Sequence, residues 1–149
     1  MDKSEIKDIK KELEHDLDSK RYEHTLGVAY TAACLAMRYG YDMEKAYSTG
    51  LLHDCAKCMS NKDKLEYCEK YDIPVTKVEQ ENPSLLHAKV GAEMSRRKYD
   101  IKDSEIYQAI MYHTTGHPQM TLLDKIIYIS DYMEPHRDEA PNLDSVRKQ

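Results

Sequence analysis

The chain has 149 residues, of which 33% are charged and 40% are hydrophobic, and its formal net charge is −5 at pH 7. A chain of this length buries about 70% of its unfolded surface, which suffices for one hydrophobic core. Residues 1–149 are therefore expected to form a single folded domain. Because the acidic balance provides no broad basic surface, nucleic acid is excluded as a partner, and a phosphate-bearing ligand must be small and held locally.

The apolar residues are too dispersed for a membrane span of roughly 20 residues, and the N-terminus lacks the apolar core of a signal peptide. We therefore expect a cytoplasmic protein without membrane contact, whose four cysteines stay reduced. Cys55 and Cys58 form a C-x-x-C pair, but no second pair is present to complete a zinc site. The cysteines are interpreted as buried or incidental thiols.

Apolar residues recur at helical spacing between only five glycines and five prolines, which predicts an all-α fold. The stripe Ile6, Ile9, Leu13 and Leu17 predicts a first helix that follows Ser4 as its N-cap. Segment 72–83 contains two prolines and is predicted to be an irregular loop, and residues 140–149 end where a new helix could begin. About seven helices are expected, and the other six cover 22–39, 43–54 after Asp42, 60–71 after Ser60, 84–99, 103–113 and 121–133, where Thr121 and Asp124 form a capping box.

Residues 50–54, Gly-Leu-Leu-His-Asp, end an apolar helix on an imidazole and a carboxylate, both of which are good ligands for a divalent ion. An antiparallel return of the chain after Gly40 would bring His53 to within about two helical turns of His24. Asp131 continues an apolar helix stripe, where a buried acid is costly unless it is paired or bound to a metal.

A hydrogen-bonded core side chain is the commoner explanation for any one such residue. The combination favours a metal site, because six residues share this placement at or near helices: His24, His53, Asp54, His87, His113 and Asp131. A simple hairpin after residue 113 would leave Asp131 about 15 Å from the level of His113. Both can serve one site only if the last long helix crosses the bundle.

The order of His24, His53-Asp54 and Asp131 resembles the signature of the HD superfamily of metal-dependent phosphohydrolases. Longer motifs resemble the YqeK family of symmetrical bis(5′-nucleosyl)-tetraphosphatases and span about Arg21 to Arg137. These motifs are Arg21-x-x-His24-x-x-Gly27-Val28, Gly50-Leu51-Leu52-His53-Asp54-x-Ala56-Lys57, Leu85-Leu86-His87-x-x-x-Gly91-Ala92, His113-Thr114-Thr115-Gly116 and Leu123-Asp124-Lys125-Ile126-x-Tyr128-x-x-Asp131-x-x-Glu134-Pro135-x-Arg137.

The resemblance implies a single-domain helical bundle of the HD type, with its core over about residues 18–137. Family chains usually continue beyond the last motif, which leaves a truncated C-terminal end open.

The same resemblance implies that His24, His53, Asp54 and Asp131 bind one or two ions of iron or of another divalent metal such as manganese or cobalt. Because such an ion lowers the pKa of bound water, the implied reaction is attack of a metal-bound water on a central phosphate of diadenosine tetraphosphate, which yields two ADP. Asp54 would orient the water as a base. His87 and His113 would either bind a second metal or act in catalysis by contacting phosphate and moving protons, and we favour phosphate contact.

Arg21, Lys57 and Arg137 are expected to bind the substrate phosphates, as Arg offers a planar fork and Lys a point charge. A solvated surface position is the usual fate of such cations, but Arg21 and Lys57 are held close to the expected metal ligands by their spacing. Thr114, at the end of a helix, offers a hydroxyl to the phosphates or the nucleoside, although an ordinary helix end explains it nearly as well.

Two alternatives remain for the function. The same metal site could act on another nucleotide, such as a nucleoside monophosphate, a cyclic dinucleotide or a guanosine alarmone. The chain could also be a metal-loaded sensor that binds a nucleotide without turnover. In the favoured case the partners are a dinucleoside polyphosphate and its ADP product, and a homodimer is left open.

Overall fold

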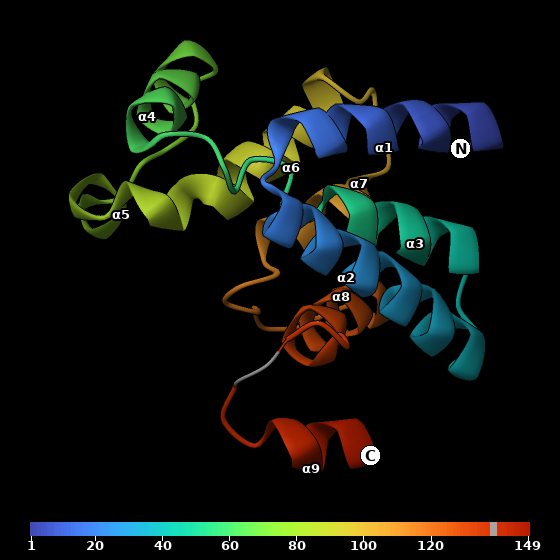
Figure 1. The fold of residues 1–149 in the computed structure, drawn as a ribbon. Helices are drawn as coiled ribbons and strands as arrows, with labels where there is room; N and C mark the ends of the chain where they lie inside the picture. The colour runs from blue at the N-terminus through green and yellow to red at the C-terminus, as the bar shows by residue number, and fades with distance from the viewer. Residues whose placement is uncertain (138–139) are drawn as a thin grey trace.

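The computed structural model describes residues 1–137 and 140–149, and all regular structure in these ranges is helical (Figure 1). The predicted all-α fold is confirmed. Among the described residues, none of the helices combines the length and the apolar character that a membrane crossing requires. The helices are α1 (Lys3–Asp16), α2 (Ser19–Arg38), α3 (Met43–Leu52), α4 (Asn61–Lys70), α5 (Lys77–Glu81), the 3₁₀ helix η1 (Pro83–Leu86), α6 (His87–Arg97), α7 (Ser104–Met111), α8 (Leu122–Met133) and α9 (Leu143–Lys148).

Most helices begin at the polar residues that the sequence predicts. Asp42, Ser60 and Thr121 each cap a helix by accepting a backbone N–H three residues later, and Thr121 forms the predicted capping box with Asp124. The prediction for the first helix was wrong by two residues, because Asp2 and not Ser4 is its N-cap. The Asp2 carboxylate accepts the N–H of Glu5, whose own carboxylate accepts the N–H of Asp2.

Segment 72–83 is not the irregular loop that its prolines suggested, because α5 forms between them. Thr76 and Glu79 form a capping box at the start of α5, and Lys89 binds the Glu79 carboxylate at 2.7 Å. Pro83 is the first residue of η1, a position at which the helix uses no backbone N–H, so proline is tolerated there. The helix expected from residue 84 therefore starts as η1 and continues as α6 from His87. The tail forms α9, in agreement with the helix start that the sequence indicated there.

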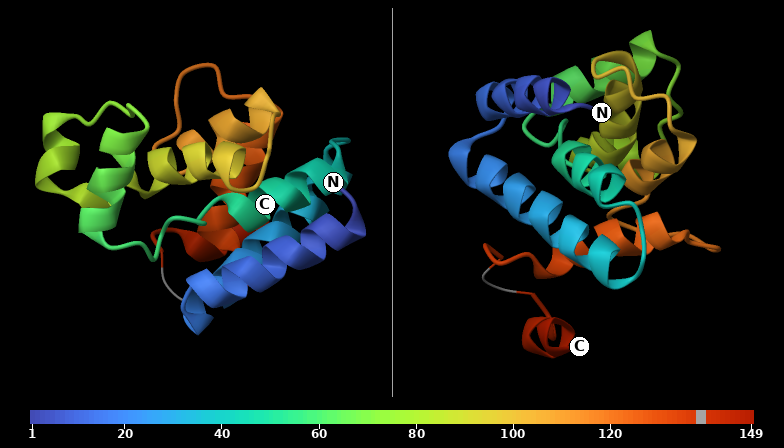
Figure 2. Two further views of the ribbon diagram at one scale, coloured as in Figure 1. Left: turned by 90° about the horizontal axis from the view of Figure 1, so that it is seen from above. Right: turned by 90° about the vertical axis from the view of Figure 1, so that its right-hand side faces the viewer.

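Helices α2 and α3 form the closest pair of the bundle, with α1 lying across them and the pair α4 and α5 standing to one side (Figures 1 and 2). Gly50 permits the close α2/α3 approach, since a Cβ at this position would lie 2.7 Å from the Cα of Ala29. The centre is filled by fully buried aliphatic side chains: Leu13, Leu51, Leu52, Leu86, Ile110, Leu123 and Ile127.

Helix α8 crosses the bundle, as the sequence required if Asp131 and His113 were to serve one site. It packs against α2, α3 and α7, and it is seen almost end-on beneath α2 in Figure 1. The chain does not form a simple hairpin after residue 113, because the segment from Tyr112 to Thr121 turns it across the bundle. The crossing brings residue 131 to the first turns of α2.

Candidate metal and active site

The structure brings together all six residues that the sequence singled out as a metal-binding combination. They form two groups of three or more potential ligands that share Asp54, and within each group the ligand atoms lie within 4.8 Å of one another. Helix α2, the end of α3, the start of α6, the end of α7 and helix α8 each contribute. The first group is His24, His53, Asp54 and Asp131, and the second is Asp54, His87 and His113.

Three of these histidines are oriented by backbone carbonyl groups. Each imidazole donates its Nδ1–H to the carbonyl three residues earlier: His53 to Gly50 at 2.6 Å, His87 to Ser84 at 3.0 Å and His113 to Ile110 at 2.7 Å. Gly50 and Ile110 lie in the last turns of their helices, where carbonyl groups lack the regular i+4 partner of the helix interior and can accept from a side chain. With the proton fixed on Nδ1, each ring turns the lone pair of Nε2 toward Asp54.

The Nε2 atom of His53 gives the clearest indication that a cation fits here. It is buried and makes no hydrogen bond to any other residue that the structure describes. It faces Asp54 Oδ2 and Asp131 Oδ1, each at 3.4 Å. A lone pair that faces two carboxylates is repelled unless positive charge lies between them, either a metal ion or a proton on Nε2 itself. Imidazole and carboxylate donors together suit iron, manganese, cobalt or zinc, and the donor set therefore fits a divalent ion.

The charges of the first group also favour a cation between its carboxylates. Burial opposes charge on His53, but the carboxylates of Asp54 and Asp131 outweigh it and raise the pKa of His53 to about 10. Burial likewise opposes ionisation of Asp54, yet the neighbouring His53 and His113 hold its pKa well below the usual value. In contrast, burial lowers the pKa of His87 to about 4, so this ring is neutral at pH 7.

Two of the three expected substrate cations border the first group. Arg21 binds Asp54 Oδ2 through Nη1 at 3.0 Å. Arg137 donates from Nε to the Asp131 carbonyl at 3.0 Å, and its Nη2 lies 3.5 Å from Oδ1 of the same residue. About a third of each Arg side chain is exposed, so both guanidinium groups can reach solvent.

Lys57 and Thr114 lie next to the second group in the chain. Lys57 follows Asp54 in a turn closed by a hydrogen bond from its N–H to the Asp54 carbonyl, and its charge contributes to the lowered pKa of His87. Thr114 is exposed and directly follows His113 in the turn after α7. A substrate role for either residue stays a prediction.

One residue of the site received no role from the sequence. Glu134 is fully buried and accepts a hydrogen bond from His24 Nδ1 at 3.1 Å. Its position in the sequence was the available signal. Glu134 lies between an apolar helix and Pro135, where a carboxylate that becomes buried needs a hydrogen-bond partner.

The thiols take no part in either group. Cys55 is buried with its Sγ 3.5 Å from the Gly91 carbonyl, and Cys58 is exposed near Asp18. All four cysteines are unpaired; Cys55 and Cys68 are buried, and Cys34 and Cys58 are exposed.

Comparison with known proteins relates this arrangement to a family. The HD domain family matches residues 21–135. Over 136 residues the chain is 41% identical to the symmetrical bis(5′-nucleosyl)-tetraphosphatase of Bacillus subtilis, with coverage of 91% of this chain and 72% of that protein. The chain belongs to the HD family of symmetrical bis(5′-nucleosyl)-tetraphosphatases.

Two further relatives extend the likeness. The protein of the same name from Staphylococcus aureus is 37% identical over 142 residues, covering 95% of this chain and 72% of that protein. A crystal structure from Clostridium acetobutylicum, described as an HD superfamily hydrolase involved in NAD metabolism, matches with a TM-score of 0.91 and 41% identity, covering 96% of this chain and 75% of that chain. The fold of an HD superfamily hydrolase thus extends over nearly the whole chain.

Proposed function

We propose that this chain is a metal-dependent hydrolase that cleaves diadenosine tetraphosphate symmetrically into two ADP. The observation that carries the proposal is the convergence of His24, His53, Asp54 and Asp131 on one point, with His53 Nε2 buried and unpaired among the described residues. The names of the relatives at 37–41% identity support the substrate and the symmetry of cleavage.

The first group of residues would hold the metal, which we propose to be iron or a similar ion such as manganese or cobalt. When bound, such an ion lowers the pKa of water and withdraws charge from a phosphoryl oxygen. Asp54 has a further task, because its Oδ1 faces the second group while Oδ2 faces the first. This carboxylate can therefore orient the attacking water as well as bind the ion.

His87 and His113 are proposed to act in catalysis on the other side of Asp54. Their Nε2 atoms lie 3.3 Å apart, and the Nδ1–H of each ring is already used by a backbone carbonyl. In the neutral rings Nε2 is therefore an acceptor, and only after it takes a proton can it donate to a phosphate oxygen. We propose that one of the two rings takes the proton of the attacking water at Nε2 and then contacts the phosphate. A second ion at this group is the alternative role.

Arg21, Lys57, Arg137 and Thr114 are the proposed contacts to the substrate. In the structure, Arg21 and Arg137 are held by Asp54 and Asp131, the two acids that a cation would neutralise. A bound ion would therefore weaken these ion pairs and leave the guanidinium forks available for phosphate oxygens. A protein of formal charge −5 needs such local cations to accept a tetra-anion.

The experiment is incubation of the purified chain with diadenosine tetraphosphate and Fe²⁺, Mn²⁺, Co²⁺ or EDTA, followed by chromatography of the products. We expect ADP as the sole product, and its loss with EDTA and in the His53→Ala/Asp54→Ala variant. AMP with ATP would reject symmetrical cleavage. Turnover only of another nucleotide would favour the alternative phosphohydrolase, and nucleotide binding with no turnover would favour the sensor.

The same proposal places the enzyme in the cytoplasm, where a dinucleotide substrate is available. The four free cysteines support this location, since a reducing compartment keeps thiols unpaired. Fractionation of cells that produce the protein, followed by detection with an antibody, would test it.

A further inference from the structure

His24 differs from the other three histidines in the position that it occupies in its helix. His53, His87 and His113 lie at or beside helix ends, and each finds an acceptor in a carbonyl of its own segment. His24 lies in the interior of α2, where the preceding carbonyl groups are engaged in the helix. Its Nδ1 therefore requires an acceptor from another part of the chain.

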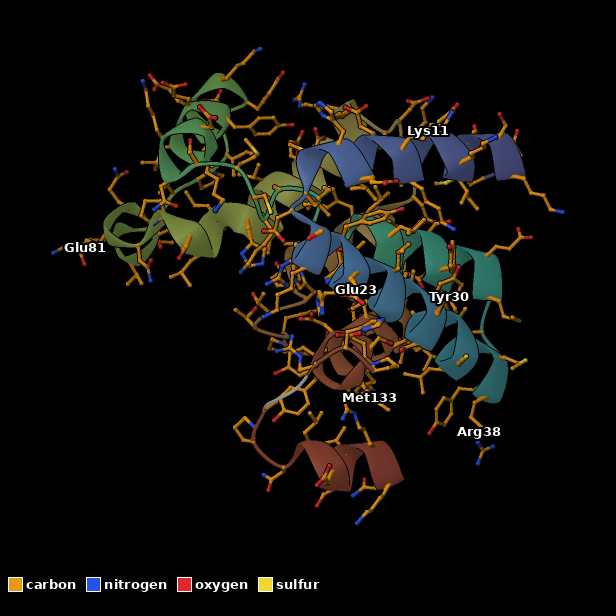
Figure 3. All side chains as sticks on the ribbon, viewed as in Figure 1. Lys11, Glu23, Tyr30, Arg38, Glu81 and Met133 are labelled. Atoms are coloured by element: carbon orange, nitrogen blue, oxygen red, sulfur yellow. The ribbon has the colours of Figure 1, made fainter. Side chains whose placement is uncertain are left out.

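Glu134 supplies this acceptor at the end of α8. Its side chain is fully buried, and its Oε1 accepts from His24 Nδ1 at 3.1 Å. The second oxygen, Oε2, accepts the backbone N–H of His136 at 2.8 Å. Because both oxygens are engaged, the carboxylate is held in one orientation. Figure 3 shows the two segments involved, with Glu23 marking the start of α2 and Met133 marking the end of α8.

Gly27 provides the space that this carboxylate occupies. Gly27 lies three residues after His24, on the same face of α2. A Cβ at Gly27 would stand 2.1 Å from Glu134 Oε2 and 3.0 Å from its Cδ. No side chain larger than hydrogen is therefore compatible with the observed position of Glu134.

The backbone that carries Glu134 is also fixed. Its N–H bonds to the Ser130 carbonyl at 3.0 Å, which ends α8. Arg147 of α9 donates from Nη2 to the Glu134 carbonyl at 2.8 Å and from Nε to the Met133 carbonyl at 3.0 Å. The carboxylate thus reaches His24 from a supported helix end.

We infer that Glu134 is a positioning residue that holds the proton of His24 on Nδ1 and directs Nε2 to the metal, with Gly27 making room for it. A carboxylate on the far nitrogen fixes the orientation of a ligand imidazole and increases its basicity. The consequence in this chain is that His24 Nε2 faces the Asp131 carboxylate at 2.9 Å, so that a bound ion would take the place of the proton between them. The inference rests on the proposed metal site, and it gives His24, the last of the four histidines in the two ligand groups, an acceptor for its Nδ1–H.

The test is the affinity of the metal-free full chain for Co²⁺, measured by calorimetric titration and by the visible absorption of the bound ion. Glu134→Ala should weaken Co²⁺ binding by about 10- to 100-fold, the usual effect of losing such a partner. Glu134→Gln should recover part of the loss, because its amide oxygen can still accept from His24. Gly27→Ala should weaken binding, and adding it to Glu134→Ala should cause little further loss, since only the milder contact with His136 Cδ2 at 3.2 Å then remains.

Asp124→Asn is the matched control. Asp124 is also a buried acid of α8 that binds a histidine, but its partners are His117 at 2.7 Å and Gln108 at 2.8 Å, outside both ligand groups. This variant should lose thermal stability and keep the Co²⁺ affinity of the unmodified chain. Equal affinity of Glu134→Ala and the unmodified chain, or an equal loss in Asp124→Asn, would overturn the inference and leave the proposed function standing. Absence of Co²⁺ binding by the unmodified chain would overturn both.

Discussion

Replacement of Gly50 by Ala tests the packing that brings the first ligand group together. A Cβ at Gly50 would lie 2.7 Å from the Cα and 3.0 Å from the N of Ala29, whereas ordinary contact begins at 3.4 Å. Since these atoms belong to the backbone of α2, neither can rotate away, and the two helices must separate by several tenths of an ångström. Overpacking of this kind costs about 1–3 kcal/mol, and the higher helix propensity of Ala returns only about 1 kcal/mol.

The expected result is a net loss of up to about 2 kcal/mol in the free energy of unfolding, or a fall of up to roughly 8 °C in the melting temperature of a chain of this size. Gly91→Ala is the matched control, because Gly91 is also buried within a helix, but its added Cβ would meet its nearest neighbour, Cys55 Sγ, at 3.6 Å. That variant should be neutral or more stable by up to about 1 kcal/mol.

The assay is urea unfolding followed by circular dichroism, with Co²⁺ titration of both variants. Gly50→Ala should also weaken Co²⁺ binding, because His53 follows Gly50 at the end of α3 and hydrogen-bonds to its carbonyl. Equal stability of Gly50→Ala and Gly91→Ala would refute the argument that the α2/α3 contact admits no side chain at Gly50.

Three further predictions concern single side chains. Burial opposes ionisation of Glu79, but Lys89 and the capping box of α5 outweigh it and lower the pKa of Glu79 from its usual 4.5. The ion pair of Glu79 and Lys89 therefore stabilises the fold fully above pH 4.5, and this stabilisation is lost as the pH falls through the lowered pKa. The stability lost in Lys89→Met at pH 7 should therefore shrink in acid, and a loss that is independent of pH in urea titrations would contradict this. The Tyr99 hydroxyl is buried without a partner among the described residues, so Tyr99→Phe should be neutral or stabilising by about 1 kcal/mol, and a clear drop in melting temperature would argue otherwise. Arg21→Met should raise KM for diadenosine tetraphosphate by roughly tenfold, the effect of losing one charge-assisted hydrogen bond, while an unchanged KM would remove Arg21 from the substrate contacts.

Helix periodicity and capping residues were sufficient to predict most of the fold. Long amphipathic stretches with a polar N-cap, such as the helix after Thr121, carry two independent signals that agree. Helix α5 was missed because Lys77–Glu81 is too short to show periodicity and because the nearby prolines indicated a loop. The capping box of Thr76 and Glu79 was the signal that could have found it.

The cluster of potential ligands was predictable because each of its residues stands out locally as a polar side chain in an apolar helix segment. Glu134 was not, because its role depends on a contact with His24 across 110 residues of sequence. That contact exists only because α8 crosses the bundle and because Gly27 leaves room for the carboxylate. Neither the crossing angle nor the space beside Gly27 can be derived from residue spacing.

The most direct test of the account is titration of the metal-free chain with Mn²⁺ or Fe²⁺, with bound metal and ADP formation from diadenosine tetraphosphate measured in the same samples. The two groups built around Asp54 predict that ADP formation is negligible without metal and rises in proportion to the ion bound. Full ADP formation by chain shown to hold no metal, or bound metal that brings no ADP formation, would contradict the account.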